Sequence, residues 1–331
     1  MFEDYSEKLK RILPKVFHVE EITNFKNMNN KSVNDLFSFN VEENEFIVRI
    51  LIRQPMVENE YYRFEKEAKL MQLFTQLGKN VSVTKENQVF IPVPKLIHME
   101  SNDDLIGYKY LIMEKIDGIS LEGVWNDLSF ENKKKIVSEL AQIIKGIHSI
   151  DYEMFGEIEE YDCPRRFYSM KSMLKSNVRK SVLKLGKKEL LPIKLLIEIQ
   201  KFVEKNLEKA NFSNEPKLVH NDLNPSNILI SNDANFSLKA ILDFEWSYAG
   251  DPIVDFWELE NHIIKEEELR DLFFERYFDG KDFNTQEFSL EKTVHKAISA
   301  LDTVAFGWVH FHPTEENINH IKRVLEEIIT E

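Results

Sequence analysis

The sequence predicts an α+β protein with a small, strand-rich amino-terminal lobe and a larger, mainly helical carboxyl-terminal lobe. Strand-like segments, apolar on one or both faces, crowd into the first third of the chain. From about residue 119 onward, most of the chain shows apolar residues at helical spacing. A length of 331 residues favours two domains or lobes over one. We therefore expect one lobe over residues 1–114 and the other over residues 115–331.

The amino-terminal lobe should begin with a short amphipathic helix over residues 2–12. Three strands are expected next, at residues 16–24, 33–42 and 45–52, followed by a long helix over residues 57–77. The segments "VFIPVPKLIHME" and "YKYLIMEKIDG" predict two more strands, the second ending in a turn. Strands bunched at the front of the chain favour this bilobal arrangement over a doubly wound sheet.

In the carboxyl-terminal lobe, the apolar pattern predicts helices over residues 130–150, 166–184 and 192–210, and again through much of 253–331. Two short apolar segments interrupt the helices. They occur in "LVHNDLNPSNILI" and in "SLKAILDFEW", and both predict buried strands beside a polar loop.

Composition restricts the class of function. The net charge of −14 argues against a nucleic-acid backbone or an anionic membrane as partner, and mildly favours a cationic ligand, although solubility alone also explains it. No apolar run approaches the roughly 20 residues that cross a bilayer. Cys163 is the single cysteine, so an internal disulfide is excluded. We expect a cytoplasmic monomer or homodimer.

The polar loop of "LVHNDLNPSNILI" carries two side chains with distinct chemistry. A carboxylate such as Asp222 can orient an alcohol and accept its proton. Five residues later, the amide oxygen of Asn227 is a hard, neutral ligand that suits Mg²⁺. Turn formation alone also explains Asn, Asp and Pro here. A second carboxylate, Asp243, follows the next apolar run, and this spacing resembles how kinases hold a base and metal ions around a triphosphate.

Together, "HNDLNPSNILI" and "ILDFEWSYAGDPIVDF" resemble the motifs of the aminoglycoside phosphotransferase family, which has a protein-kinase-like fold. The resemblance implies that Asp222 is the catalytic aspartate and that Asn227 and Asp243 are Mg²⁺ ligands. It also implies that His220 and Asp255 support the catalytic loop, although Asp255 could equally cap a helix.

Two residues depart from related patterns. Asn221 stands where the family often has Gly, and Glu245 stands where protein kinases have the Gly of Asp-Phe-Gly. Only six residues separate Asp243 from Gly250, which leaves no room for a long activation segment. This argues for a small-molecule substrate rather than a protein.

The amino-terminal lobe should supply a cation for the nucleotide phosphates. Arg49 lies in a strand that is apolar on both faces, and Glu67 lies within the apolar stripe of the following helix. Burying either charge unpaired would be costly, so we expect an ion pair resembling the family's Lys–Glu pair. Solvent exposure of both residues is the alternative.

The other residues of the nucleotide site are implied by the resemblance to the family. "KSVNDLFSF" resembles part of the phosphate loop, which implies roles for Ser32 and Asn34, yet residues 23–36 contain no glycine. "YLIMEKIDG" resembles the hinge, which implies that the carbonyl of Glu114 and the amide of Ile116 contact adenine.

The acceptor site is least defined by the sequence. Glu258, Glu260 and Trp257 are candidates to bind a cationic acceptor, although solvated helix faces explain the same glutamates. The resulting hypothesis is a Mg²⁺-requiring, ATP- or GTP-dependent O-phosphotransferase acting on a small, cationic, hydroxylated molecule, with an aminoglycoside antibiotic as the family's default. A macrolide, a choline- or homoserine-like metabolite, a non-catalytic nucleotide-binding protein and a protein kinase are the alternatives.

Overall fold

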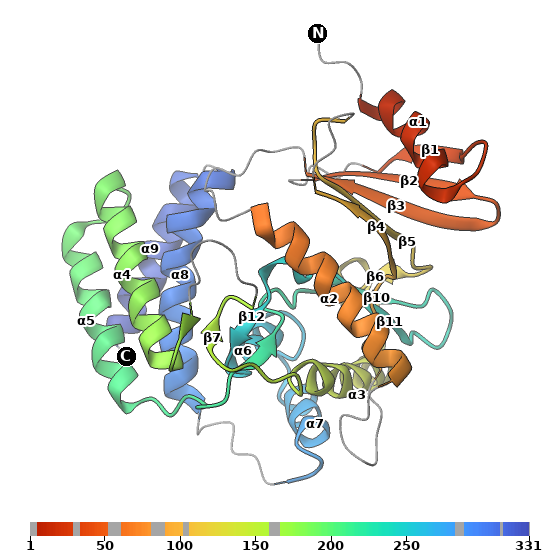
Figure 1. Ribbon diagram of the computed structural model, residues 1–331. Coiled ribbons are helices and arrows are strands. Elements are labelled where there is room, and N and C mark those ends of the chain that lie inside the picture. Colours follow the sequence, from red (N-terminus) through yellow and green to blue (C-terminus); the bar gives the residue numbers. More distant parts are fainter. Residues whose placement is uncertain are drawn as a thin grey trace. The chain divides into compact units, whose positions relative to one another are not determined.

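The computed structural model describes residues 5–28, 34–51, 61–80, 90–101, 106–158, 166–281, 288–311 and 314–330 (Figure 1). The chain divides into two compact units. The first comprises Met1–Ile143 and Pro225–Trp246, and the second comprises Ile144–Asn224 and Ser247–Glu331. The segment Pro225–Trp246 thus belongs with the amino-terminal sheet, and the division into lobes at residue 114 stays a prediction.

The first unit contains an antiparallel five-stranded sheet with the order β1-β2-β3-β5-β4. Every neighbouring pair of strands is antiparallel, which confirms the predicted α+β class. The register is set largely by β2 and β3, which join through a tight turn and pair along their whole length. The strands are β1 (Thr23–Asn27), β2 (Asp35–Val41), β3 (Asn44–Ile50), β4 (Leu96–Glu100) and β5 (Tyr110–Glu114).

Helix α1 (Tyr5–Phe17) packs on this sheet and corrects one prediction. The strand expected at residues 16–24 is wrong, because the helix continues through Pro14 to Phe17 and β1 begins only at Thr23. Leu9 and Leu13 are fully buried against the apolar face of the sheet. Burying side chains of this size contributes about 1.5–3 kcal/mol each, which outweighs the hydrogen bond lost at proline.

Three further elements of the first unit position the candidate site. Helix α2 (Tyr61–Asn80) follows β3, and helix α3 (Phe130–Ile147) carries the predicted apolar stripe, with Ile136, Val137 and Leu140 fully buried. A small antiparallel sheet has the order β11-β10-β6. Its strands are β6 (Ile119–Ser120), β10 (Ile228–Ile230) and β11 (Leu238–Ile241).

The second unit is mainly helical, as predicted. Its helices are α4 (Met170–Lys188), α5 (Ile193–Lys209), α6 (Ile253–His262), α7 (Glu267–Tyr277), α8 (Ser289–Phe311) and α9 (Glu315–Thr330). A four-stranded antiparallel sheet has the order β8-β7-β12-β9. Its strands are β7 (Phe155–Gly156), β8 (Arg166–Phe167), β9 (Lys217–Val219) and β12 (Tyr248–Gly250). Across the part of the chain that the structure describes, no helix has both the length and the apolar character to span a bilayer.

Candidate active site

The buried guanidinium of Arg49 is the centre of the candidate site in the first unit. Arg49 lies on β3, and its Nη1 donates a hydrogen bond of 3.3 Å to Oε1 of Glu67 on α2. Its Nη2 pairs with the other carboxylate oxygen of Glu67. The two side chains are only 8% and 5% exposed, so each charge depends on the other for compensation. The ion pair expected from the sequence is therefore present.

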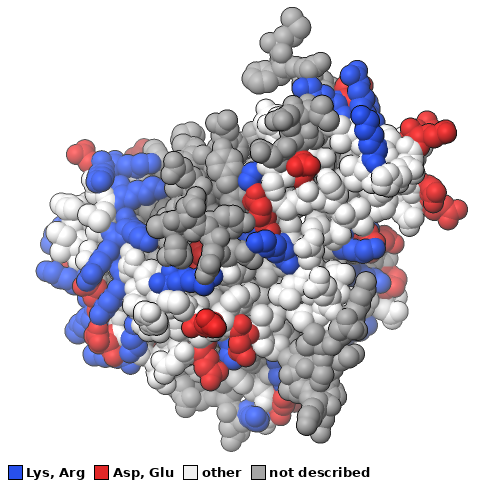
Figure 2. Space-filling view, in the orientation of Figure 1, with Lys and Arg blue, Asp and Glu red and all other residues white. Residues whose placement is uncertain are grey.

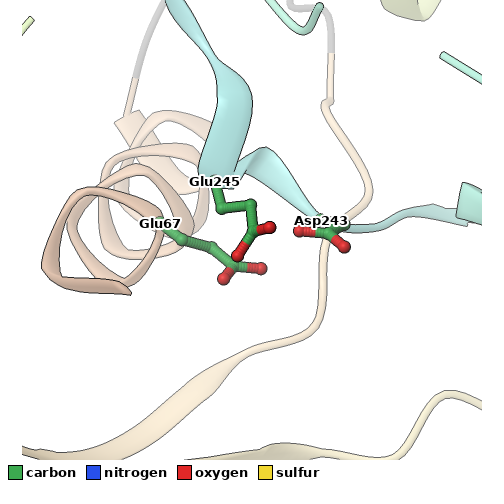
Figure 3. Close-up of side chains that lie close together, drawn as sticks. All are labelled: Glu67, Asp243 and Glu245. Atoms are coloured by element: carbon green, nitrogen blue, oxygen red, sulfur yellow. The ribbon is translucent and has the colours of Figure 1, made fainter. Parts of the chain in front are cut away.

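Two more carboxylates face the same guanidinium. Nη1 of Arg49 lies 3.8 Å from Oδ1 of Asp243, and Nη2 lies 3.8 Å from Oε2 of Glu245. Oxygens of Glu67, Asp243 and Glu245 come within 4.8 Å of one another, and Figure 3 shows the three side chains converging from α2 and from the segment after β11. The guanidinium of Arg49 thus faces three carboxylates, and the charges of Arg63 and Lys66 also act on Glu245, in the direction that lowers its pKa.

The protonation of this cluster follows from burial and charge together. Burial lowers the pKa of Arg49, but the charges of Glu67, Asp243 and Glu245 outweigh it and raise the pKa overall. Burial, with the repulsion from Asp243, raises the pKa of Glu245. Burial also raises the pKa of Glu67, although Arg49 opposes this shift. A further cation bound here would relieve the repulsion among the carboxylates.

Asn227 immediately precedes β10 and Asp243 follows β11, so both lie at the same end of these two antiparallel strands. Ile228 pairs with Ile241, and the backbone N–H of Leu242 donates a 2.8 Å hydrogen bond to the carbonyl oxygen of Asn227. Oδ1 of Asp243 is buried and has no hydrogen-bond partner among the described residues. An amide oxygen and a carboxylate oxygen that lacks a donor are hard oxygen ligands, so these residues fit Mg²⁺.

Aromatic contacts hold α2 against the segment that follows Asp243. The rings of Phe74 and Phe244 pack with centroids 4.8 Å apart, and both side chains are buried. One end of α2 is held by Arg63, whose guanidinium lies 3.5 Å from the ring centroid of Trp246. These contacts fix the helix that carries Glu67 relative to the carboxylates of Asp243 and Glu245.

In the second unit, Asp222 lies in the loop after β9, five residues before Asn227 along the chain. The side-chain amide of Asn224 donates a hydrogen bond of 2.8 Å to Oδ1 of Asp222. The backbone N–H of Asp222 lies 3.2 Å from Nδ1 of His220, which is fully buried. The carboxylate of Asp222 is therefore oriented by its own loop.

Asp255 supports this loop from helix α6. Its fully buried carboxylate accepts backbone hydrogen bonds from His220, at 2.8 Å, and from Asn221, at 2.7 Å. Oδ2 of Asp255 also lies 2.9 Å from Nε2 of His148. Burial raises the pKa of Asp255, but its contacts with His148 and His220 outweigh burial and lower the pKa overall. The ionised carboxylate thus holds two consecutive backbone amides of the loop.

The backbone explains the departure at Asn221. Asn221 has φ = 63°, in the left-handed region that favours glycine, and asparagine tolerates this region better than most residues. Asn can therefore occupy the position where the family often has Gly. Asp243 has a similar φ of 64°.

The residues predicted for nucleotide contact are only partly described. Ser32 lies outside the described residues, and Asn34 lies in a bend just before β2. Glu114 is the last residue of β5, and Ile116 follows it in an irregular segment. Contact of these residues with a nucleotide stays a prediction.

The predicted acceptor residues lie on α6 in the second unit. Glu260 pairs with Lys292 at 2.5 Å, and Glu258 lies 3.5 Å from Nε2 of His262. The ring of Trp257 packs edge-on against His295, with centroids 5.3 Å apart. Lys292 thus compensates Glu260, and binding of an acceptor by Glu258, Glu260 or Trp257 stays a prediction.

Sequence reasoning missed several residues of the site. The sequence gives Asn224 no evident role, yet its side-chain amide contacts Asp222 directly. His148 and Tyr277 form a hydrogen bond of 2.9 Å between residues 129 positions apart, which no local pattern announces. Glu245 was noted only as a departure, although its place two residues after Asp243 could have suggested a shared site.

Comparisons with known proteins identify the family and the fold of this chain. A model of the phosphotransferase enzyme family matches residues 30–288. No curated protein matches this chain in sequence. Among solved structures, a thermostable mutant of aminoglycoside phosphotransferase APH(4)-Ia with ADP and hygromycin B has a TM-score of 0.68 at 13% identity, over 98% of each chain.

Two further solved structures have the same fold. ADP-bound aminoglycoside phosphotransferase APH(2'')-Ib has a TM-score of 0.64 at 18% identity, over 99% of each chain. The streptomycin–ATP–APH(2'')-IIa complex has a TM-score of 0.64 at 17% identity, over 100% of this chain and 97% of that one. With its kinase-like α+β fold and a family match over more than half of its length, the chain belongs to the phosphotransferase enzyme family.

Proposed function

We propose that this protein transfers the terminal phosphoryl group of ATP or GTP to a hydroxyl of a small, cationic molecule of the aminoglycoside type. The observation that carries the proposal is the buried Arg49–Glu67 pair beside Asp243, whose Oδ1 has no hydrogen-bond donor among the described residues. A fixed cation next to a hard oxygen ligand is what a metal-bound triphosphate requires.

Within this proposal, Asn227 and Asp243 hold Mg²⁺. When bound, Mg²⁺ neutralises charge on the phosphate oxygens of the nucleotide. Arg49 binds the phosphates with a guanidinium that Glu67 keeps in place. Ser32, Asn34, Glu114 and Ile116 complete the nucleotide site in this proposal.

Asp222 orients the acceptor hydroxyl and accepts its proton at a carboxylate oxygen as phosphoryl transfer proceeds. The hydrogen bond from Asn224 to Oδ1 fixes the rotation of this carboxylate. Asp255 fixes the backbone that carries it. Orientation of this kind is the main contribution that protein side chains make to phosphoryl transfer, because the reaction needs positioning more than covalent chemistry.

The short chain after Asp243 supports a small acceptor. A single turn of 3₁₀-helix, Phe244–Trp246, leads directly into β12 at Tyr248, so no activation segment lies between them. The net charge of −14 and the carboxylate of Glu258 support a cationic acceptor, with Trp257 beside it. Macrolides and amino alcohols related to choline or homoserine are the other acceptors to test.

The test is nucleotide consumption with Mg²⁺ and a panel of aminoglycosides, macrolides and amino alcohols. Asp222→Asn should abolish acceptor-stimulated turnover while it keeps nucleotide binding. Asp233→Asn, in the turn after β10, is the matched control and should keep full activity. A wild-type protein that stays inert on every acceptor and binds no Mg²⁺-nucleotide would overturn the proposal.

A second candidate is a nucleotide-binding protein without catalysis. Two observations favour it: residues 23–36 contain no glycine, and the guanidinium of Arg49 already faces three carboxylates. Under this alternative, ATP with Mg²⁺ raises the melting temperature but no acceptor stimulates nucleotide consumption.

A further inference from the structure

Helices α4 and α5 form a strongly basic surface on an acidic protein. Helix α4 contains seven Lys or Arg residues and no Asp or Glu. Residues 170–209 together contain eleven Lys or Arg and four Glu, a net charge of +7 in a chain of −14. Figure 2 shows Lys and Arg gathered on the side where α4 and α5 lie in Figure 1. Net charge therefore misrepresents this part of the surface.

Exposed apolar side chains gather on the same two helices. Leu183 on α4 is 65% exposed, while Ile193 and Ile197 on α5 are 62% and 44% exposed. Solvated aliphatic side chains of this size are common singly, but a contiguous group suggests a surface that is covered by a partner.

The geometry makes these three residues one stripe. Cδ1 of Ile193 lies 3.7 Å from the position that a Cβ would take on Gly186, so Ile193 sits beside the last turn of α4. Leu183 is three residues before Gly186, and Ile197 is four residues after Ile193, so each pair shares a helix face. We call Leu183, Ile193 and Ile197 the hairpin stripe.

Lysines flank the hairpin stripe at helical spacing. Lys180 and Lys187 lie three residues before and four residues after Leu183, and Lys188 follows; all three side chains are exposed. Two of the four glutamates lie at the opposite end of the hairpin, where Glu204 pairs with Arg179 at 2.9 Å and Glu208 pairs with Lys175. The other two, Glu189 and Glu198, lie near the hairpin stripe, where Glu198 pairs with Lys194 at 3.8 Å. Residues 180–198 contain five lysines and two glutamates, so this end of the hairpin keeps a net positive charge.

We propose that the outer face of the α4–α5 hairpin docks on an anionic lipid membrane. Lipid phosphates would bind the flanking lysines, while the hairpin stripe enters the boundary between headgroups and acyl chains. The expectation of no membrane partner was based on net charge, which averages over this segregated surface. The docking is peripheral and is independent of the proposed phosphotransfer.

Other occupants explain less of the surface. A symmetric contact with a second copy would set two basic hairpins against each other, which is repulsive. A nucleic acid would bind the lysines but would leave the hairpin stripe in water. An anionic bilayer accounts for both the charge and the aliphatic side chains.

The test is co-sedimentation of the full-length protein with vesicles of phosphatidylcholine, alone or mixed with phosphatidylglycerol. We expect binding only to the anionic vesicles, weakened by added salt. Both L183S/I193S/I197S and K180E/K187E/K188E should weaken binding by about tenfold or more. The matched control K26E/K265E/K281E changes the net charge equally at exposed sites elsewhere and should bind like the wild type.

Failure of the wild type to bind anionic vesicles, equal binding to neutral vesicles, or an equal loss in the control would each overturn the proposal. Binding of a polyuridine RNA that the serine variant retains, without vesicle binding, would assign the surface to polyanions instead. Urea denaturation checks that the variants fold. If the serine variant is unstable, the lysine variant, which alters only exposed side chains, decides the outcome alone.

Discussion

Nε2 of His148 lies 2.9 Å from Oδ2 of Asp255, so a histidine just after α3 contacts the carboxylate that holds the loop of Asp222. The other ring nitrogen, Nδ1, lies 2.9 Å from the hydroxyl of Tyr277. Because the Asp255 carboxylate is ionised, Nε2 of His148 must donate to it, and both contacts fix the plane of the ring. Tyr277, His148 and Asp255 thus form a continuous line of contacts to the backbone of the loop.

Replacing His148 should weaken both stability and catalysis. His148→Ala leaves the buried Asp255 with one donor fewer, and we expect a loss of about 1–3 kcal/mol in unfolding free energy. Turnover should fall while the KM for nucleotide stays constant, because only the loop that carries Asp222 is affected. Tyr277→Phe is the milder comparison, since it removes one hydroxyl. Equal effects on the KM for nucleotide and on turnover would indicate a general disturbance of the fold rather than a loss of positioning in the loop that carries Asp222.

Asn224→Ala should lower turnover without lowering stability. The hydrogen bond to Oδ1 of Asp222 restricts the rotation of a carboxylate that is only half-buried, so its loss changes orientation more than packing. We expect about a tenfold fall in turnover, corresponding to about 1.4 kcal/mol. Steady-state kinetics with the acceptor identified from the panel measures the effect. Ser226→Ala, at an exposed position of the same loop, is the control and should leave turnover unchanged.

Arg49→Met should be strongly destabilising, by about 3–5 kcal/mol, because it leaves Glu67 buried without its cation. The double variant Arg49→Met/Glu67→Met removes both charges and should recover much of that loss. Arg49→Lys keeps the charge but loses the two-pronged contact with Glu67, so its cost should be smaller. Chemical denaturation measures the unfolding free energies of the three variants and hence their order of stability. A double variant that is no more stable than Arg49→Met would contradict the pairing of Arg49 with Glu67.

The stabilisation of the protein by ATP with Mg²⁺ should require the carboxylate of Asp243. ATP with Mg²⁺ should raise the melting temperature of the wild type, whereas ATP with EDTA should not, because binding to the folded state stabilises it by about 2.7 kcal/mol at a hundredfold excess over Kd. Asp243→Asn keeps the side-chain size but loses the charge, and it should abolish the Mg²⁺-dependent shift. The control Asp233→Asn should keep the shift. A full shift with EDTA would argue against a metal at Asn227 and Asp243.

His295 should make the protein sensitive to acid. Burial lowers the pKa of His295 from 6.5 to about 4, and its Nδ1 has no hydrogen-bond partner among the described residues. Since the unfolded chain binds this proton first as pH falls, stability is complete above about pH 6.5 and is lost progressively down to about pH 4. His295→Leu should remove up to about 3 kcal/mol of this loss. The exposed His320→Leu is the control, and identical pH profiles for both variants would contradict the assignment.

The cost of burying a charge, applied to the sequence alone, was sufficient to predict part of the candidate site. Arg49 and Glu67 were paired because neither apolar strand nor apolar helix face tolerates an isolated charge, and the structure contains that pair. The positions of Asn227 and Asp243 followed from apolar strands on either side of polar loops. By contrast, the helix through Pro14 was missed because proline and β-branched residues favour ending a helix, whereas packing against the sheet extends it.

Contacts between distant segments could not be predicted from one sequence. The hydrogen bond between His148 and Tyr277 joins residues 129 positions apart, and periodicity does not specify such a contact. The backbone N–H of Asn221 likewise donates to the carboxylate of Asp255, 34 positions along the chain. Local sequence patterns predicted which side chains could act as a base or bind a metal. Tertiary packing determines which of these side chains contact one another.

The direct passage from Asp243 through one 3₁₀ turn into β12 has a consequence for control of the enzyme. Kinases that are switched on and off by modification use a long segment at this point, which can be ordered or displaced. Three turn residues and a strand leave no length for such a switch. Activation by modification of a segment at this point is therefore not expected, and the described residues between Asp243 and β12 should need no rearrangement before the enzyme acts.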